Sequence, residues 1–276
     1  MTYDVLGPGP LDYLPCRYGA SKLLFRGPKR DLDQPYVAFI GATETYGKFI
    51  GKPFPALLEA ALGTACVNFG QINAGIDAFA HDPFVIEAAS GARVTVIQVL
   101  GAQNMSNRFY SVHPRRNDRF LGATPLLREM FREVDFADYH FNKHMLGALL
   151  RVSPERFETV RQALQQTWCA RMRLLLGQIE GPKVLLWFSA RRPERERRKG
   201  RGLGLDPLFV TRAMLEEVSP LAHQVVEVAA SPRARAAGRD GMIFAEMDAP
   251  AAAQLLGPVA HEEAARALCP VIRPLL

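Results

Sequence analysis

The sequence predicts a three-layer α/β/α fold, in which a doubly wound, mostly parallel sheet of about five strands carries helices on both faces. Short apolar runs without period-2 alternation indicate strands that are buried on both faces. Each of the first three runs ends in a glycine or a glycine-bearing turn followed by polar side chains, and helical patterns separate the runs. This alternation favours parallel strands with right-handed crossovers, which place all the turns at one edge of the sheet.

The predicted elements follow in chain order. Strands are expected at residues 36–40, 65–69, 94–100, 183–188 and 224–228. Helices are expected at 53–63, 83–90, 154–176, 211–218 and 261–268. The predicted organisation is an irregular N-terminal arm (1–35) and one α/β domain (36–276). That domain carries a lid-like insertion at about 108–150 and a basic loop at 190–204.

Composition narrows the class of protein. A hydrophobic fraction of 48% over 276 residues is enough for a substantial core. No apolar run approaches the roughly 20 residues that cross a bilayer, and the N-terminus lacks the pattern of a signal peptide. We therefore expect a cytoplasmic protein without a membrane partner. The four cysteines are far apart in sequence and form no metal or redox motif, and three of them have apolar surroundings that predict buried free thiols; the four are Cys16, Cys66, Cys169 and Cys269.

The net charge of +6 comes mainly from one segment. Residues 191–201 hold seven basic and two acidic side chains. Such a run is either a solvated loop or a patch that binds anions. No aromatic residues interleave with the arginines, so we predict no nucleic-acid partner.

The turn after the first predicted strand reads G-A-T-E-T-Y-G, from Gly41 to Gly47, and carries hydroxyls at Thr43 and Thr45. Ligands of open α/β sheets bind outside the carboxyl ends of the strands, so a site is expected here. Threonines are also common helix N-caps, which leaves an ordinary capping turn as the alternative.

Two further turns are expected at the same edge. The second strand leads into G-Q-I-N-A-G, with Asn73 and Gly75, and the third leads into G-A-Q-N, with Gln103 and Asn104. Backbone and side-chain amides in such positions can stabilise a developing oxyanion, whereas in a plain polar turn they bond their own backbone. Arg108, at the start of the insertion, is a further candidate for substrate binding.

These three turns resemble the sequence blocks of the SGNH/GDSL hydrolases. That family's G-D-S-x-x-x-G corresponds to G-A-T-E-T-Y-G, which puts Thr43 in the place of the nucleophilic serine. The family's N-x-G-x-x-G puts Asn73 in the place of the oxyanion-hole glycine, with Gly75 two residues further on. Its G-x-N-D puts Gln103 and Asn104 in the places of the asparagine and the aspartate. The chain also resembles an uncharacterised proteobacterial branch in this neighbourhood, whose function is unknown.

A threonine nucleophile needs an adjacent base. The family takes its base from a late D-x-x-H, and the last histidine here is His261, with Pro258 where the acid would stand. The resemblance therefore implies His261 as the base and leaves Asp248 as the nearest acid that could orient it. The alternative is a histidine that caps or flanks a helix start.

The activity that the resemblance implies is ester hydrolysis, or acyl transfer, on acyl groups of a carbohydrate or other small molecule, without a cofactor. The missing serine and the missing D-x-x-H also allow a protein that has lost this chemistry and binds a glycan or a protein partner. T-E-T-Y-G partly resembles the FMN-phosphate loop of flavodoxins, but Tyr46 replaces the glycine that this loop needs. Nucleotide binding is therefore the less favoured alternative.

Three histidines lie in the predicted insertion. His113, before Pro114, Arg115 and Arg116, belongs either to an anion-binding loop or to a solvated one. His140 and His144 have a spacing that can hold a metal on a helix, but the intervening Lys143 would repel a cation. We predict no metal site.

Overall fold

A computed structural model of the chain describes residues 11–194 and 202–276. The main sheet has five parallel strands: β1 (Tyr36–Ile40), β2 (Ala65–Asn68), β3 (Val94–Gln98), β6 (Lys183–Ser189) and β7 (Gln224–Ala229). Their spatial order is β2-β1-β3-β6-β7. This is the flavodoxin-like doubly wound order, which confirms the predicted fold class. Each predicted strand is present, and β2 and β3 end one and two residues earlier than expected.

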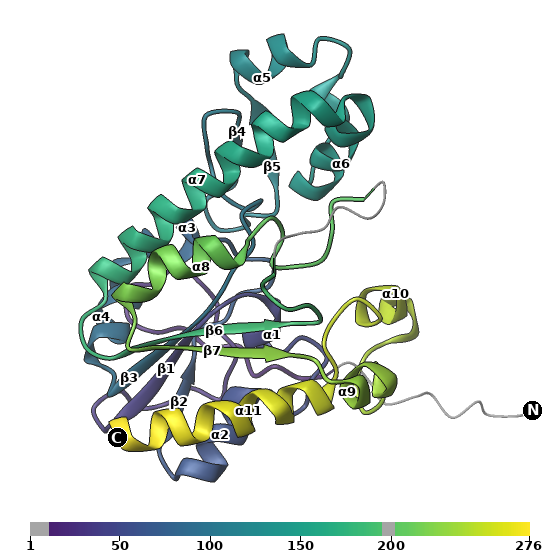
Figure 1. The fold of residues 1–276 in the computed structure, drawn as a ribbon. Helices are drawn as coiled ribbons and strands as arrows, with labels where there is room; N and C mark the ends of the chain where they lie inside the picture. The colour runs from purple at the N-terminus through teal and green to yellow at the C-terminus, as the bar shows by residue number, and fades with distance from the viewer. Residues whose placement is uncertain (1–10, 195–201) are drawn as a thin grey trace, which may run out of the picture.

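Both faces of the sheet are covered by helices (Figure 1). Alternate residues of β1 enter different cores, since Ala38 and Ile40 pack on one side while Val37 and Phe39 pack on the other. The first core is closed by α3 (Asp77–Ala80), α4 (Pro83–Gly91), α7 (Pro154–Gln178) and α8 (Arg212–Val218). The second is closed by α2 (Phe54–Leu62), α9 (Pro232–Ala237) and α11 (Pro258–Ile272).

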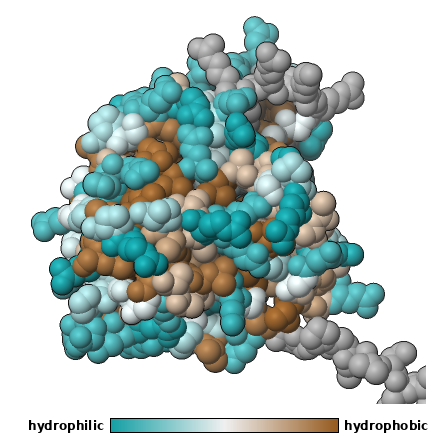
Figure 2. Space-filling view, turned by 60° about the horizontal axis from the view of Figure 1, so that its bottom comes forward, coloured by the Kyte–Doolittle hydropathy of each residue, from teal (hydrophilic) through white to brown (hydrophobic). Residues whose placement is uncertain are grey.

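The C-terminal helix α11 is longer than predicted. The sequence pattern ended it at Cys269 and Pro270, whereas the helix continues past Pro270 to Ile272. A proline inside a helix loses one hydrogen bond, and here Leu268 and Ile272 on either side of it are fully buried in the second core. The burial of these two side chains therefore outweighs the free-energy cost of the hydrogen bond lost at Pro270. Figure 2 turns this side toward the viewer and shows apolar patches separated by hydrophilic residues.

The insertion lies between β3 and α7 and has its own secondary structure. It contains the antiparallel hairpin of β4 (Tyr110–Val112) and β5 (Phe120–Ala123), followed by α5 (Pro125–Met130) and α6 (Asn142–Val152). Figure 1 shows it projecting beyond the sheet, at the end where α5 is labelled. Its buried side chains, among them Tyr110 and Phe120, belong to the same core as α7.

The described part of the N-terminal arm packs on the domain. Cys16 and Phe25 form an isolated antiparallel bridge, and Tyr18 and Phe25 are buried in the first core. Arg26 is 7% exposed and donates hydrogen bonds to the carbonyls of Tyr46, Gly47, Ile50 and Gly51. The arm thereby holds the segment that follows α1 (Thr43–Tyr46), directly after β1.

The basic segment is only partly described. Residues 195–201 of the predicted loop lie outside the described residues. Arg191, at its start, donates to the carbonyls of Leu205, Pro207 and Val210, so its guanidinium braces the connection between β6 and α8.

Candidate functional site

The turns after β1, β2 and β3 converge at the carboxyl edge of the sheet. Thr43 is the first residue of α1 and is 7% exposed. Its hydroxyl donates to Oδ1 of Asn73 at 3.2 Å and accepts from the backbone amide of Asn73 at 2.9 Å. Nδ2 of Asn104 donates to the backbone carbonyl of Asn73 at 2.9 Å. The convergence expected of Thr43, Asn73 and Asn104 is therefore present.

Asn73 has a left-handed backbone, with φ at 57°. Asparagine adopts this conformation more readily than most residues. It aims both its amide and its carboxamide at Thr43, while Nδ2 donates to Asp118 Oδ2 in the insertion at 3.2 Å. A flipped carboxamide would turn its oxygen toward the Asp118 carboxylate, so this contact sets the orientation.

The insertion is attached to this cluster through two buried asparagines. Asn117 Oδ1 accepts from the amide of Gly75 at 2.9 Å. Asn142 Nδ2 donates to Asn104 Oδ1 at 3.1 Å and to the carbonyl of Asn117 at 2.5 Å. The Gly75 amide, one of the expected oxyanion donors, is thus used by the protein itself. A Cβ on Gly75 would lie 1.7 Å from the carbonyl oxygen of Asn104, so the close approach of the two turns requires glycine here.

His261 does not join the cluster around Thr43. It is 1% exposed in the second core, where its ring stacks on Phe54 at 5.9 Å between centroids and meets Phe188 edge-on at 5.1 Å. Its Nδ1 accepts from the backbone amide of Phe54 at 3.2 Å. Burial, with a smaller contribution from the charge of Arg26, lowers the pKa of His261 to about 3. The hydrogen bonds described for Thr43 and His261 go to different partners, Asn73 and Phe54.

The remaining predicted residues are placed as follows. Asp248 ends a short 3-10 turn (Glu246–Asp248) before α10 (Ala249–Ala252) and is partly exposed. No hydrogen bond to His261 is described for it among residues 11–194 and 202–276. Arg108 is exposed, with its guanidinium 5.0 Å from the Phe109 ring centroid. Gln103 is 5% exposed, and its Nε2 donates to Asp206 at 3.4 Å.

The histidines of the insertion have separate environments. His113 Nδ1 accepts from the amides of Arg115 and Arg116, which makes it part of a turn. His140 precedes α6 and is exposed, while His144 lies on α6 with its ring 4.9 Å from that of Tyr139. The described residues contain no group of three or more potential ligands that could hold a metal ion. None of the helices in the described part of the chain has the length and hydropathy to cross a membrane.

The point between the carboxyl ends of β1 and β3 is the topological switch point of this strand order. The side chains that gather there were not predicted from the sequence. Gln98, the last residue of β3, is 4% exposed. Its Oε1 accepts from the amides of Ala42 and Thr45 and from the hydroxyl of Thr45, while its Nε2 donates to Glu44 Oε2 at 3.1 Å.

Two residues distant in sequence lie near this edge of the sheet. Asp206, from the β6–α8 connection, accepts from Lys143 of α6 at 2.5 Å. Burial and the negative charge of Asp206 raise the pKa of Glu44, with Gln98 and Lys143 acting in the opposite direction. No sequence motif marks these positions, since Glu44 stands between the two threonines of the Gly41–Gly47 block, Lys143 lies on α6, and Asp206 comes from the β6–α8 connection.

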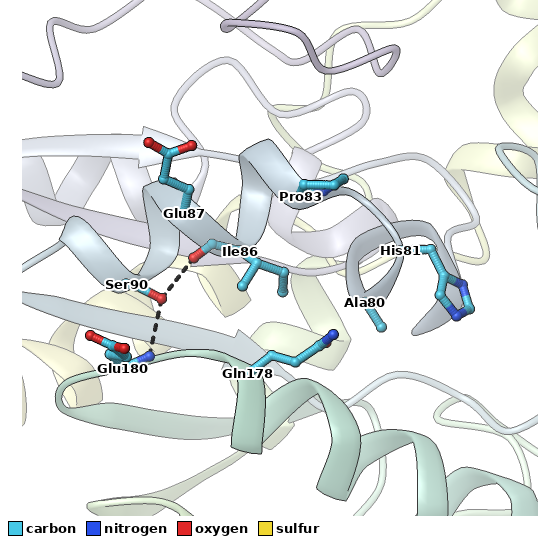
Figure 3. Close-up of a pocket in the computed structure, with 8 residues that line it drawn as sticks. All are labelled: Ala80, His81, Pro83, Ile86, Glu87, Ser90, Gln178 and Glu180. Carbon is cyan, nitrogen blue, oxygen red and sulfur yellow. Dashed lines mark hydrogen bonds between the residues drawn. The ribbon is translucent and has the colours of Figure 1, made fainter.

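A hollow of about 530 Å³ lies elsewhere, between α4 and the end of α7 (Figure 3). Ser90 and Glu180 in its wall precede β3 and β6, so the hollow is at the amino ends of the strands. The Ser90 hydroxyl donates to the Ile86 carbonyl and accepts from the Glu180 amide, so its hydrogen bonds go to groups of the wall itself. The turns at the carboxyl edge are therefore the better candidate site.

The fold and the edge of converging turns define a flavodoxin-like α/β protein. The chain belongs to the family described as Domain of unknown function (DUF6473), which matches residues 1–276. No curated protein matches the sequence.

Two solved structures are similar to this chain in their overall backbone arrangement. One is the lipase Lip_vut3 from a goat rumen metagenome, with a TM-score of 0.44, 11% identity, and coverage of 85% of this chain and 96% of the lipase. The other is LAE5, an alpha/beta hydrolase enzyme from the metagenome of Lake Arreo, Spain, with a TM-score of 0.41, 13% identity, and coverage of 88% and 96%. TM-scores below 0.5 are too low to carry the activity of either protein to this chain.

Proposed function

We propose that the chain binds a polar small molecule of the carbohydrate class at the carboxyl edge of the sheet, without hydrolysis by a Thr43–His261 pair. The observation that carries this proposal is the double hydrogen bond between Thr43 and Asn73. The proton of the Thr43 hydroxyl points to a carboxamide oxygen, and a carboxamide does not act as a general base near neutral pH. A threonine nucleophile needs a base at that place.

The position of His261 supports the same proposal. An imidazole whose Nδ1 accepts the Phe54 amide, and whose pKa lies at about 3, is neutral and occupied in the core. A general base works best with a pKa near the operating pH and within hydrogen-bond reach of the proton it removes.

The side chains of the crevice support a ligand rich in hydroxyl groups. Carboxamides and carboxylates offer directional donors and acceptors, and five of them gather where β1 and β3 end, namely Glu44, Gln98, Gln103, Asn104 and Asp206. The resemblance to SGNH hydrolases, a family that includes enzymes acting on acylated carbohydrates, points to the same class.

Ester hydrolysis is the second candidate. It is favoured by the Asn73 amide, which lies 2.9 Å from the Thr43 hydroxyl oxygen in the block where SGNH enzymes have an oxyanion-hole donor. This candidate requires a base other than His261.

Two measurements separate the candidates. The first is hydrolysis of p-nitrophenyl acetate by the wild type, by Thr43→Val, and by Thr64→Val as a control at the amino end of β2. Equal background rates in all three proteins are expected, whereas a rate lost only in Thr43→Val would overturn the proposal in favour of the hydrolase.

The second measurement is binding to an array of immobilised neutral, acetylated and amino oligosaccharides. We expect retention on at least one class, weakened in Asp206→Asn and unchanged in Asp33→Asn, which lies before β1 at the opposite edge. Retention on none of the classes would contradict carbohydrate binding.

A further inference from the structure

A second pocket, of about 100 Å³, lies where the N-terminal arm meets β2 and the start of α2. Arg26, Arg30, Ala56 and Glu59 are among the residues that line it, and it shares none of its residues with the candidate functional site. One water molecule takes up about 30 Å³ in the liquid, so the pocket has room for a group of about three or four non-hydrogen atoms.

The guanidinium of Arg26 is a buried charge in the wall of this pocket. The residue is 7% exposed, and its guanidinium lies 5.2 Å from the ring centroid of Tyr13. Both Nη atoms donate to backbone carbonyls after α1, at 2.6 to 3.0 Å. Within residues 11–194 and 202–276, no hydrogen bond is described for Nε and no ion pair for Arg26. Carbonyl dipoles satisfy N–H groups but carry no net charge, and burying a charge without a counter-ion is costly.

The carboxylate of Glu59 does not neutralise Arg26. Its Oε1 accepts from Nη2 of Arg30 at 2.6 Å, and its Oε2 accepts from Nε of Arg30 at 2.8 Å and from the amide of Cys66 at 2.8 Å. Both oxygens are therefore engaged by Arg30 and β2. Two guanidinium groups and one carboxylate leave the pocket with a net charge of +1, which favours a monovalent anion.

The first turn of α2 adds partial positive charge to the same pocket. Pro53, at the N-cap, offers no side-chain acceptor, and Pro55 has no N–H. The Phe54 amide donates to His261, whereas no acceptor for the Ala56 amide is described in the resolved parts of the chain. Amides of a first helical turn attract anions. The buried guanidinium and this helix start are two independent features that attract negative charge to one small pocket.

We propose that this pocket binds one small monovalent anion, between the Arg26 guanidinium and the first turn of α2. The anion is a carboxylate of the size of formate or acetate, or a chloride ion. The same guanidinium holds the carbonyls that follow α1, so the bound anion stabilises that segment. This site is separate from the one in the proposed function and does not depend on it.

The first test is thermal unfolding of the full chain at about pH 7, where these carboxylates are charged. The chain is compared in sodium formate, acetate, chloride and gluconate at equal ionic strength. Gluconate is a monovalent carboxylate that is too large for the pocket. Ala56→Phe fills the pocket, and Ala60→Phe, which is also exposed on α2 but does not line it, is the matched control.

Binding to the folded state raises the midpoint of unfolding. With formate at about ten times its Kd, we expect the wild type and Ala60→Phe to melt at least about 2 °C higher than in gluconate. Ala56→Phe should melt at the same temperature in both salts.

A second measurement needs no variant. Saturation transfer from the wild-type protein to the formate proton should be detectable by NMR and should disappear when excess acetate is added. Transfer that acetate does not reduce would reflect unspecific contact and would overturn the proposal.

The salts also distinguish the kinds of anion. A higher midpoint in formate and acetate alone supports a carboxylate site, and a higher midpoint in chloride as well supports a site for either anion. Equal midpoints of the wild type in all four salts overturn the proposal, as does a response to formate that Ala56→Phe retains. Each of these results leaves the proposed carbohydrate binding untouched.

Discussion

Asn73 holds the Thr43 hydroxyl on both sides, as acceptor through Oδ1 at 3.2 Å and as donor through its amide at 2.9 Å. The arrangement extends to Asp118, which accepts from Nδ2 of the same asparagine. A hydroxyl, a planar polar side chain and a carboxylate stand in the order of a hydrolytic triad, with a carboxamide in the place of the imidazole. Under the proposed function, this carboxamide is the reason that the Thr43 hydroxyl keeps its proton.

The left-handed backbone of Asn73 gives a first prediction. Asn73→Ala and Asn73→Gly both remove the side-chain bonds to Thr43 and Asp118, but only alanine also meets the steric cost of φ at 57°. We expect Asn73→Ala to be less stable than Asn73→Gly by about 1 kcal/mol, measured by urea denaturation. Equal stabilities would show that the backbone relaxes at this turn.

Gly75 gives a second prediction. In Gly75→Ala the new Cβ meets the Asn104 carbonyl, which is backbone and cannot swing aside. We expect a loss of about 2 kcal/mol or more, in the range of overpacking substitutions. Gly177→Ala, on α7 with open space around the added Cβ, should instead be more stable by about 0.5–1 kcal/mol. A neutral Gly75→Ala would mean that the two turns approach less closely.

Arg26 gives a third prediction. Arg26→Met keeps the apolar stem but leaves four carbonyls after α1 without their donor. Unsatisfied buried groups cost about 1–3 kcal/mol each, so a total loss above about 3 kcal/mol is expected in thermal and urea unfolding. The control Arg17→Met removes an exposed guanidinium with a single long bond to Lys22 and should change stability by less than about 0.5 kcal/mol.

Glu44 gives a fourth prediction, on pH. Its folded pKa is raised above the ordinary value of 4.5, so the folded state binds the proton more tightly than the unfolded chain. The associated stability is fully present below 4.5 and is lost as the pH rises through the folded pKa. Glu44→Gln should therefore exceed the wild type in melting temperature at neutral pH and lose that advantage in acid. A constant difference across the range would exclude a raised pKa.

His261 gives a fifth prediction with the opposite sign. Its folded pKa of about 3 lies below the ordinary 6.5, so its contribution to stability is present above 6.5 and is lost as the pH falls toward 3. The slope within that window is about 1.4 kcal/mol per pH unit. His261→Asn keeps an acceptor for Phe54 and removes the titration, so its stability should fall less steeply over the same window. If the two proteins lose stability in parallel, the imidazole is not the group responsible.

Much of the fold was predictable because the strands are short, apolar and separated by clear helical patterns. Because parallel strands with right-handed crossovers place their turns at one edge of the sheet, the turns that carry residues 43, 73 and 104 are expected on the same side. The extent of α11 was not predictable, since the burial of Ile272 decides it and a local rule about Pro270 does not.

The site was harder to predict than the fold. The spacing of motifs places Thr43 in the turn after β1, but it carries no information about which face of the sheet a distant helix covers. His261 packs in the second core, whereas its position before E-E-A-A-R had implied a catalytic base. Glu44, Lys143 and Asp206 share no motif, and only the folded chain brings them together.

The buried asparagines at positions 117 and 142 fasten the insertion to the ends of the strands. An insertion attached by these bonds is held in one position before any ligand binds. We accordingly expect a ligand to bind without a rearrangement of this insertion, so that diffusional encounter limits the rate of association.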